Sequence, residues 1–385
     1  MKCLSTKATS IKPSGIRKFF DLASTMEGVI SLGVGEPDFA TPWHICENAI
    51  HYMSTGHTHY TANRGLLELR EEICKFHKEH YNQVYDPENE VIVTIGGSEA
   101  IDLCMRALLN PGDEVIVLDP NYVAYAPSVI LSDGVVVPLK LKENDFKILP
   151  EDLKKVITPK TKAMIINYPS NPTGGVMTKE DYAKIIDIIK ESGIYVISDE
   201  IYAELSFDQP FASLAQFDEI KSQIIVVNGF SKAYAMTGWR LGYCMANKEL
   251  SSIMNKIHQY VIMSAPVMSQ YAGIEAIKNG YNDVLMMKED YLKRRNFLVN
   301  RLNRMGLKTN MPHGTFYVFC NIQSTGLDSE TFCERLLQEQ KVACVPGNAF
   351  GNSGEGYVRI SYAYSIDHIK EAVVRLEQFL KDLDK

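Results

Sequence analysis

The chain has 385 residues, of which 45% are hydrophobic and 23% are charged, and its formal net charge is −7 at pH 7. This length exceeds what one hydrophobic core usually holds, so two domains are expected. Lysine and arginine are scattered among acidic residues without a basic tract, which gives no support to a nucleic-acid partner. No stretch is long and apolar enough to span a bilayer, and the first residues lack an apolar signal segment. We therefore expect no membrane contact and a cytoplasmic location.

The cysteines are the next feature that limits the class of protein. Eight of them stand far apart without a C-x-x-C pair, which predicts reduced, mostly buried thiols. Cys74, His77 and His80 have ligand-like spacing on a charged helix, but no second pair of ligands is in sight. We interpret these three residues as a solvated helix face and expect no metal.

The first 280 residues alternate between helical and strand patterns. Residues 15–27 predict a short amphipathic helix, and the glycines and prolines of 30–42 predict an irregular loop. Further helices are expected at 43–54, 66–80, 98–109, 122–132 and 178–191, and strands at 90–95, 114–118, 134–139, 162–167, 194–198, 224–227 and 241–245. Such alternation predicts an α/β fold with a largely parallel sheet that is covered by helices on both faces.

The remaining residues predict a second, smaller unit. Two helices are expected around 248–279, a long charged helix at 283–304, strands near 315–321 and 356–362, and helices near 328–339 and 366–382. We therefore divide the chain into an N-terminal arm over 1–42, a large domain over 43–280 and a small α/β domain over 281–385. The arm is expected to pack with the small domain.

A glycine turn follows the strand predicted at 90–95. Gly96, Gly97 and Ser98 stand between this strand and a helix, where free backbone N–H groups and the helix dipole favour a bound anion. The alternative is a plain tight turn in which Ser98 is the N-cap of the helix.

Three further strand ends carry aromatic or polar side chains. Tyr122 follows the strand predicted at 114–118 and can either pack in the core or stack on a planar ring. Asn171 lies in a turn made by two prolines and a glycine, where its amide can donate to a phenolic oxygen. Asp199 follows a buried run and needs a partner such as a protonated pyridine nitrogen, with Tyr202 on the same side of a helical turn. The alternatives are a helix N-cap for Asp199 and a core position for Tyr202.

A lysine follows the strand predicted at 224–227. Large apolar and aromatic residues flank Lys232, and burial favours the neutral amine that can form a Schiff base. Arg240, eight residues later, is a fixed cation suited to a phosphate. The alternative is an ordinary solvated lysine. Because open α/β sheets keep their active sites at the carboxyl ends of the strands, these residues together point to pyridoxal phosphate. In the small domain, Arg359 lies in an apolar strand and needs an anion such as a substrate α-carboxylate.

The chain resembles the aspartate aminotransferase family, the class I group of fold type I pyridoxal phosphate enzymes. Three segments carry the resemblance in the family's order: Ser-Asn171-Pro-Thr-Gly, Ser-Asp199-Glu-Ile-Tyr202 and Ser231-Lys232-Ala-Tyr-Ala-Met-Thr-Gly-Trp-Arg240-Leu-Gly. The match covers nearly the whole chain. Its nearest look-alikes are the bacterial and archaeal aromatic aminotransferases and the N-acetyl-diaminopimelate aminotransferases.

The resemblance implies a role for each residue around the cofactor ring. Lys232 would bind pyridoxal phosphate covalently and, once released, carry a proton between substrate and cofactor. Asp199 would pair with the pyridine nitrogen, Asn171 and Tyr202 with the ring oxygen, and Tyr122 would stack on the ring.

It also implies how the phosphate and the substrate are held. Backbone amides at Gly97 and Ser98, the side chain of Arg240 and that of Ser231 would bind the phosphate. Tyr60 would reach the phosphate of a neighbouring subunit, which implies a homodimer with two shared sites. The substrate α-carboxylate would be held at Gly35 and Arg359, with Tyr122 and Asn171 also facing the substrate, and the small domain would close over it.

Two positions depart from the family pattern. Gly229 stands where many members carry a phosphate-binding serine, so Ser231 is a candidate replacement. Tyr260 stands where aspartate-specific members of one branch carry an arginine for the side-chain carboxylate. This second departure leaves room for aromatic or neutral side chains.

The resemblance implies a transaminase that moves the α-amino group of an L-amino acid, aromatic, aspartate or related, to a 2-oxo acid such as 2-oxoglutarate. The reaction would follow a ping-pong mechanism. The alternative within the same fold is a pyridoxal phosphate-dependent C–S β-lyase. A cofactor-sensing transcription regulator would need an added DNA-binding segment. A nucleotide site is disfavoured because Gly33-Val-Gly35 lacks a third glycine and no G-K-[ST] loop exists.

Overall fold

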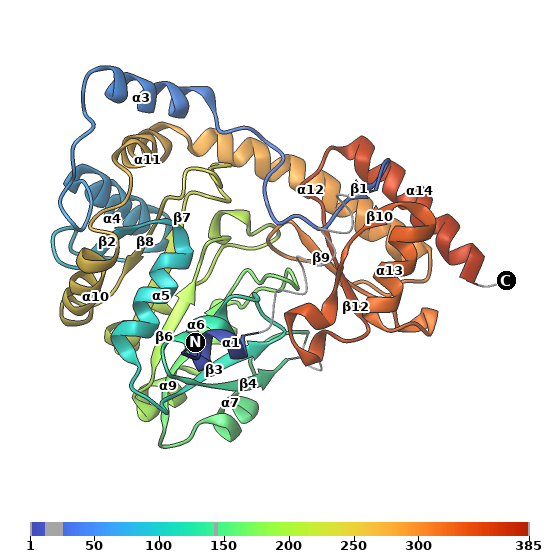
Figure 1. Ribbon diagram of the computed structural model, residues 1–385, viewed down its shortest axis with the longest axis horizontal. Coiled ribbons are helices and arrows are strands. Elements are labelled where there is room, and N and C mark those ends of the chain that lie inside the picture. Colours follow the sequence, from blue (N-terminus) through green and yellow to red (C-terminus); the bar gives the residue numbers. More distant parts are fainter. Residues whose placement is uncertain (1, 12–25, 142–144, 384–385) are drawn as a thin grey trace.

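The computed structural model describes residues 2–11, 26–141 and 145–383 and arranges them around a large sheet and a small sheet joined by one long helix (Figure 1). The helix predicted over 15–27 lies almost entirely outside these residues, so it stays a prediction. Among the described residues, none of the helices is long and apolar enough to cross a membrane.

Within the described ranges, seven strands form the large sheet in the order β2-β8-β7-β6-β5-β3-β4. They are β2 (Val91–Thr94), β3 (Glu114–Asp119), β4 (Val135–Lys140), β5 (Thr161–Asn167), β6 (Tyr195–Asp199), β7 (Ile224–Gly229) and β8 (Gly242–Met245). β8 is antiparallel to both of its neighbours, and the remaining neighbours pair in parallel. The prediction of a largely parallel sheet is therefore confirmed. All strands except β8 end at the same edge.

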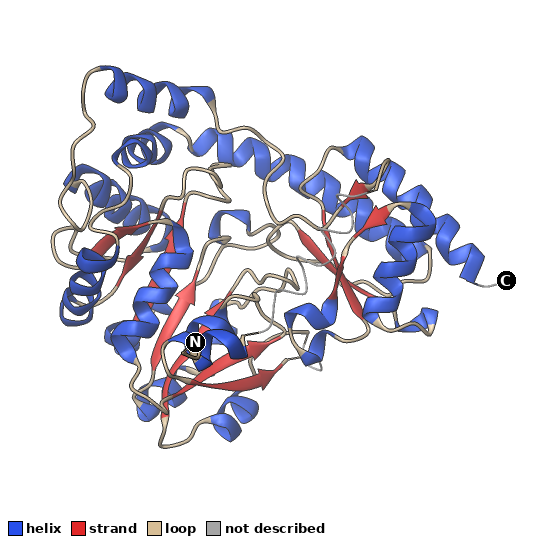
Figure 2. Cartoon of the chain, in the orientation of Figure 1, coloured by secondary structure: helices blue, strands red, loops and turns tan. Residues whose placement is uncertain are grey.

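Helices surround this sheet (Figure 2). They are α1 (Thr6–Ser10), α3 (Trp43–Ser54), α4 (Leu67–Tyr81), α5 (Gly96–Leu108), α6 (Tyr125–Leu131), α7 (Pro150–Val156), α8 (Lys179–Ala183), α9 (Ile186–Ser192), α10 (Lys248–Val261) and α11 (Val267–Asn279). Local signals fix several ends: Thr178 and Asp181 form a reciprocal capping box at α8, and the Asn247 side chain accepts from the Leu250 N–H at α10.

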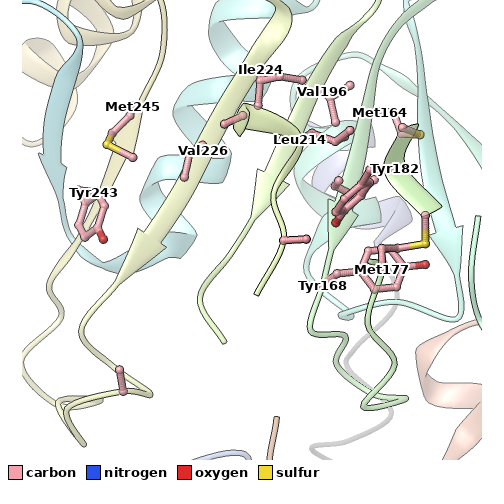
Figure 3. Close-up of a cluster of buried hydrophobic side chains, with 14 of the residues drawn as sticks. Met164, Tyr168, Met177, Tyr182, Val196, Leu214, Ile224, Val226, Tyr243 and Met245 are labelled. Atoms are coloured by element: carbon pink, nitrogen blue, oxygen red, sulfur yellow. The ribbon is translucent and has the colours of Figure 1, made fainter. Parts of the chain in front are cut away.

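Successive residues of each strand enter two different cores, because side chains alternate between the faces of a sheet. In β3, Val115 and Val117 belong to one core, whereas Ile116 and Leu118 belong to the other. Figure 3 shows part of the second core, where Val226 of β7 lies among side chains of neighbouring strands. Both faces of the sheet are thus buried under helices, as the alternating pattern predicts.

A separate group of elements surrounds the small sheet. Its strands β9 (Tyr317–Asn321), β11 (Val345–Pro346) and β12 (Tyr357–Ser361) pair antiparallel, and β1 (Ile30–Ser31) pairs in parallel with β10 (Val342–Ala343). The helices here are α12 (Tyr281–Arg304), α13 (Ser329–Gln340) and α14 (Ile366–Leu383). Together they enclose a third core.

The connection between the two groups is continuous. Val284 of α12 packs in a core of the large sheet, whereas Met287 and Leu298 of the same helix pack in the third core. The short helix α1 lies on the large-sheet side, where Lys7 forms a 2.8 Å ion pair with Asp133 beside α6. The division into 1–42, 43–280 and 281–385 stays a prediction.

Some local predictions differ from the structure. The helix expected over 178–191 is two helices, α8 and α9, because the backbone at Ile185 (φ −111°, ψ −5°) interrupts the helical geometry between them. The short strands β1, β10 and β11 were not predicted, since two-residue strands carry no readable period. The helix α7 was also missed.

The prediction of a solvated helix face at Cys74, His77 and His80 is wrong for His77. This residue follows Ile73 by four positions and precedes Tyr81 by four, so it lies on the buried stripe of α4. Its imidazole contacts Gln83 (2.7 Å) and Tyr243 (2.8 Å), and burial lowers its pKa to about 4. The prediction about thiols is confirmed for the described residues, whose cysteines are free and mostly buried.

A buried carboxyl lies directly after β6. Glu200 is 1% exposed and accepts hydrogen bonds from the hydroxyls of Ser198 and Ser213, while its Oε2 has no partner among the described residues. Burial raises its pKa to about 7, against which both hydroxyl donors act. The folded chain therefore binds this proton more tightly than the unfolded chain does.

Replacement Glu200→Gln is expected to change how stability depends on pH. Between about pH 4.5 and 7, the wild-type chain should lose stability as pH rises, because the folded state holds a proton that the unfolded state has released. Glutamine keeps the acceptor without the charge, so the variant should lack this loss and gain about 3 kcal/mol over wild type at pH 8 relative to pH 4.5. Denaturant unfolding of the cofactor-free proteins at both pH values measures the difference. Parallel stability curves would contradict it.

Candidate active site

A cavity of about 340 Å³ lies at the edge of the large sheet where the parallel strands end. The predicted site residues that line it are Gly35, Gly97, Ser98, Tyr122, Asn171, Asp199, Tyr202, Ser231, Lys232, Arg240 and Arg359. Most of them lie at or just after the ends of five strands of the large sheet. Arg359 comes from the small sheet, and Gly35 comes from the segment after β1. The fold thus brings together residues that are hundreds of positions apart.

Lys232 lies three residues beyond the end of β7 and is mostly buried. Its Nζ donates to the carbonyl oxygen of Gly35 at 2.6 Å. Burial and, to a smaller extent, the charge of Arg359 lower the pKa of Lys232 to about 8, whereas Glu36 and Asp199 act in the opposite direction. Compared with an ordinary lysine, a larger fraction of this amine is neutral near neutral pH, which favours its action as a nucleophile.

Asp199 is the last residue of β6 and is 6% exposed. The Tyr125 hydroxyl donates to its Oδ2 at 2.6 Å, and the Ile201 N–H donates to Oδ1 at 3.2 Å. Burial raises the pKa of Asp199 to about 6, which these donors oppose. Among the described residues, none forms an ion pair with this carboxylate. A cationic ligand group at this position would complete its environment.

Two asparagines at the end of β5 are fixed by their neighbours. Asn167 donates from Nδ2 to the Asp199 carbonyl at 2.8 Å and accepts from the Asn171 N–H at 2.9 Å. The Asn171 Oδ1 accepts from Arg359 Nη1 at 2.9 Å. Because the guanidinium can only donate, the amide orientation of Asn171 is set, and its NH₂ group is left to donate elsewhere.

Arg359 of β12 is 3% exposed. Its Nη2 donates to the Gly33 carbonyl at 2.7 Å, and the rings of Tyr317 and Phe350 lie 4.2 Å and 4.7 Å from its guanidinium carbon. Within the described chain, Arg359 forms no ion pair and its Nε has no hydrogen-bond partner. A buried arginine without a counter-charge is suited to bind a carboxylate from a ligand.

The start of α5 also lines the cavity. The helix begins at Gly96, so Ser98 is not the N-cap as one interpretation had it; the Glu99 carboxylate accepts from the Ile95 N–H instead. Gly97 and Ser98 therefore belong to the first turn, whose N–H groups have no partner within the helix. Arg240 is close by, since a Cβ added at Gly96 would lie 2.9 Å from its Nη2.

Close backbone packing explains why position 229 is a glycine. Gly229 pairs with Gly242 across β7 and β8. A Cβ at position 229 would lie 2.9 Å from the Gly242 Cα and 3.0 Å from the Leu241 carbonyl oxygen. A serine would not fit here without movement of the backbone. The buried hydroxyl of Ser231 lines the cavity two residues later.

Tyr60 is the predicted site residue that the structure does not bring into the cavity. It is 83% exposed, and its assigned role requires a second subunit. Tyr260 is 84% exposed and also lies outside the cavity lining. From the sequence, Ile16 and Arg17 are also expected to influence substrate preference, and both lie outside the described residues.

Tyr125, Asn167 and Tyr317 line the same cavity and were missed from the sequence. Tyr125 follows Tyr122 by three residues at a helix start, a spacing that could have suggested a shared face. Asn167 is the polar end of an apolar strand. Tyr317 had no usable signal, because its place depends on how β9 pairs with β12.

The fold and the cavity define an α/β protein whose buried lysine, buried carboxyl and helix N-terminus together suit a small anionic ligand. The chain belongs to the class I and II aminotransferases, whose family model matches residues 27–376. The Bacillus subtilis (strain 168) protein YugH, named only as an aminotransferase, is 50% identical over 98% of both chains. An aspartate aminotransferase of Pyrococcus abyssi is 44% identical over 98% of both chains. The solved structure of an aromatic aminotransferase from Pyrococcus horikoshii OT3 is 43% identical with a TM-score of 0.91, covering 95% of this chain and 99% of that one.

The protein is therefore an aminotransferase, and its family uses pyridoxal phosphate. The cavity fits this cofactor on two observations. Within the described part of the chain, no cationic side chain forms an ion pair with the buried Asp199 carboxylate, and a protonated pyridine nitrogen would suit this position. The N–H groups of the first α5 turn and the Arg240 side chain line the same cavity, and such a helix start with a nearby cation would suit the phosphate. The β-lyase alternative is not favoured, because the relatives compared here are aminotransferases.

Proposed function

We propose that this aminotransferase moves the α-amino group of an aromatic amino acid, aspartate or a related L-amino acid to a 2-oxo acid such as 2-oxoglutarate. The observation that carries the proposal is Arg359, a buried guanidinium that lines the same cavity as Lys232 and has no counter-charge among the residues that the structure describes. A substrate α-carboxylate at Arg359 would place the amino group between this arginine and the lysine. The two half-reactions would alternate in a ping-pong order.

Bound pyridoxal phosphate supplies a reactive carbonyl carbon and an electron-withdrawing ring. Lys232 would hold it covalently and then, as a free amine, remove the proton from the substrate Cα and return it to the cofactor. The lowered pKa of Lys232 supports this role, because a general base works best when its pKa lies near the working pH. Asp199 would keep the pyridine nitrogen protonated, with Tyr125 and Asn167 holding the aspartate in place.

The remaining residues would bind and orient. Asn171 and Tyr202 would donate to the ring oxygen, and Tyr122 would stack on the ring. Gly97, Ser98, Ser231 and Arg240 would hold the phosphate. Gly35 would join Arg359 at the substrate carboxylate, with Tyr122 and Asn171 beside it. Closure of the small domain over 281–385 would exclude water.

The range of donors is supported by the relatives and by one exposed residue. Relatives at 43–44% identity are named for aromatic amino acids or for aspartate. Tyr260 stands in place of an arginine that would favour a dicarboxylate substrate. We therefore include amino acids with aromatic side chains among the proposed donors.

A homodimer is part of the same proposal. Trp43, Tyr60 and Tyr260 are 68%, 83% and 84% exposed, which is unusual for large aromatic rings and typical of a surface that a partner covers. Tyr60 would then reach the phosphate in the neighbouring subunit. Sedimentation velocity measures the assembly directly. The cytoplasmic location stays a prediction.

The absorption spectrum of the purified holoenzyme tests the function. Addition of phenylalanine, tyrosine, aspartate or glutamate without any oxo acid should bleach the visible cofactor band and release one oxo acid per site, because the first half-reaction needs no acceptor. Subsequent addition of 2-oxoglutarate should restore the band. Release of ammonia and pyruvate from a cysteine conjugate, with no bleaching by these donors, would overturn the proposal in favour of the lyase.

A further inference from the structure

Tyr317 lies where the small sheet meets the cavity, and it has no part in the function proposed for the site. It is the first residue of β9, is 1% exposed, and lines the cavity together with Lys232 and Arg359. It contacts residues from three separate parts of the chain. The inference drawn from it rests on the proposed roles of Arg359 and Tyr202.

The pairing of β9 with β12 places the Tyr317 ring against Arg359. Arg359 is directly opposite Phe319, and Tyr317 stands two residues before Phe319 on the same face. Such diagonal neighbours are within reach of aromatic and long side chains. The ring centroid of Tyr317 lies 4.2 Å from the guanidinium carbon of Arg359, which is cation–π distance in a buried setting.

The hydroxyl of the same side chain reaches the cofactor side of the cavity. Tyr317 Oη lies 3.2 Å from Tyr202 Oη, and either hydroxyl can be the donor. If Tyr202 donates to a ligand oxygen in the cavity, its own oxygen is left to accept from Tyr317. Chained hydroxyl donors of this kind polarise and strengthen one another.

The third contact is with the segment after β1. A Cβ built at Gly35 would collide with Tyr317 Oη, so the glycine backbone and the hydroxyl occupy adjoining space. The Gly35 carbonyl accepts from Lys232 Nζ. One side chain thus touches the arginine proposed for the substrate carboxylate, the tyrosine proposed for the ring oxygen and the backbone that meets the lysine.

We propose that Tyr317 is a positioning residue with two separable functions. Its ring holds the Arg359 guanidinium in the orientation that receives the substrate carboxylate. Its hydroxyl donates to Tyr202 and strengthens the hydrogen bond that Tyr202 makes to the bound cofactor. The simpler interpretation is that Tyr317 only fills the core, in which case its hydroxyl is dispensable and other apolar side chains of similar volume serve as well.

The hydroxyl function is tested by pH titration of the visible band in the holoenzyme. Donation to the ring oxygen favours its anionic form, so a weaker donor raises the pH at which the bound chromophore loses its proton. Tyr317→Phe should raise this pH by about half a unit, the size expected for one neutral hydrogen bond. Tyr202→Phe should raise it further.

Tyr291 provides the matched control. It is another fully buried tyrosine of the third core, and its hydroxyl has no partner among the described residues. Tyr291→Phe should leave the titration unchanged. An equal shift in Tyr291→Phe, or none in Tyr317→Phe, would overturn the hydroxyl function.

The ring function is tested by the affinity for a non-reacting carboxylate, 3-phenylpropanoate, measured from the spectral change it causes. Tyr317→Phe keeps the ring and should bind within about twofold of wild type, whereas Tyr317→Leu should bind about tenfold more weakly. Equal affinity in all three proteins would overturn this function. If the leucine variant does not fold, Tyr317→Met, which also removes the aromatic face, replaces it and should likewise weaken binding.

Failure of this inference is distinguishable from failure of the proposed function. A wild-type protein with no visible band would refute the role of Lys232 and, with it, the role of Tyr317. A wild-type band that bleaches with amino acids, together with unaltered Tyr317 variants, would refute the inference alone.

Discussion

Replacement Lys232→Ala is expected to lower the rate of transamination by about 10⁴-fold, the upper range for loss of a general base. The variant loses the amine that would hold the cofactor and move the substrate proton, while the other residues of the cavity remain. Single-turnover loss of the visible band after addition of an amino acid measures the rate. An exogenous small amine should restore part of it, since the remaining cavity can position a free base.

Lys288 is the matched control for this substitution. It is also partly buried, and burial likewise lowers its pKa, but it belongs to α12 and does not line the cavity. Lys288→Ala should keep the wild-type rate. A Lys232→Ala protein that retained more than about a tenth of the rate would contradict the proposed role, because loss of a general base should lower the rate by at least about 10²-fold.

Replacement Arg359→Gln is expected to lower kcat/KM for amino acids by about 10²- to 10³-fold, mainly through KM. The value follows from the 2–5 kcal/mol that a buried charge–carboxylate contact typically contributes when one partner is removed. Arg359→Lys should recover part of the loss only, because an ammonium cannot reproduce the planar fork that also holds Asn171 and Gly33. Steady-state kinetics with a saturating oxo acid measure both parameters.

Arg295 separates substrate binding from folding. It is as buried as Arg359, at 4% exposed, but it pairs with Asp208 at 2.7 Å and lies outside the cavity lining. Arg295→Gln should lower the melting temperature and leave KM unchanged. If Arg359→Gln likewise changed only the melting temperature, the carboxylate role would be wrong.

Part of this site was predictable because several of its residues stand at the ends of apolar runs. Strand patterns place Asn171, Asp199 and Lys232 just after buried strands, and the carboxyl ends of parallel strands meet at one edge. That rule alone predicts their proximity, and the structure confirms it through the shared cavity. The resemblance to a family then added chemical roles, which the comparisons support at the level of the reaction and the cofactor.

Other features were not predictable, because they depend on contacts between distant segments. The burial of His77 was missed because the charged helix was interpreted as solvated, and its contact with Tyr243, 166 residues away, has no local signal. Tyr125 was missed because its partner Asp199 lies 74 residues away. The start of α5 was predicted two residues too late, at Ser98. The carboxylate of Glu99 accepts from the Ile95 N–H, and the helix begins at Gly96.

By itself, the sequence determined the alternation of helices and strands, the largely parallel sheet and the identity of the residues at its edge, since these follow from local periodicity and turn chemistry. The tertiary structure decided which side chains lie against one another: Tyr125 on Asp199, Tyr317 on Arg359 and Tyr202, and the glycine backbone of Gly229 against Gly242. The physical reason is that periodicity is a property of consecutive residues, whereas the register between strands and the space left beside a backbone arise only when separate segments pack together.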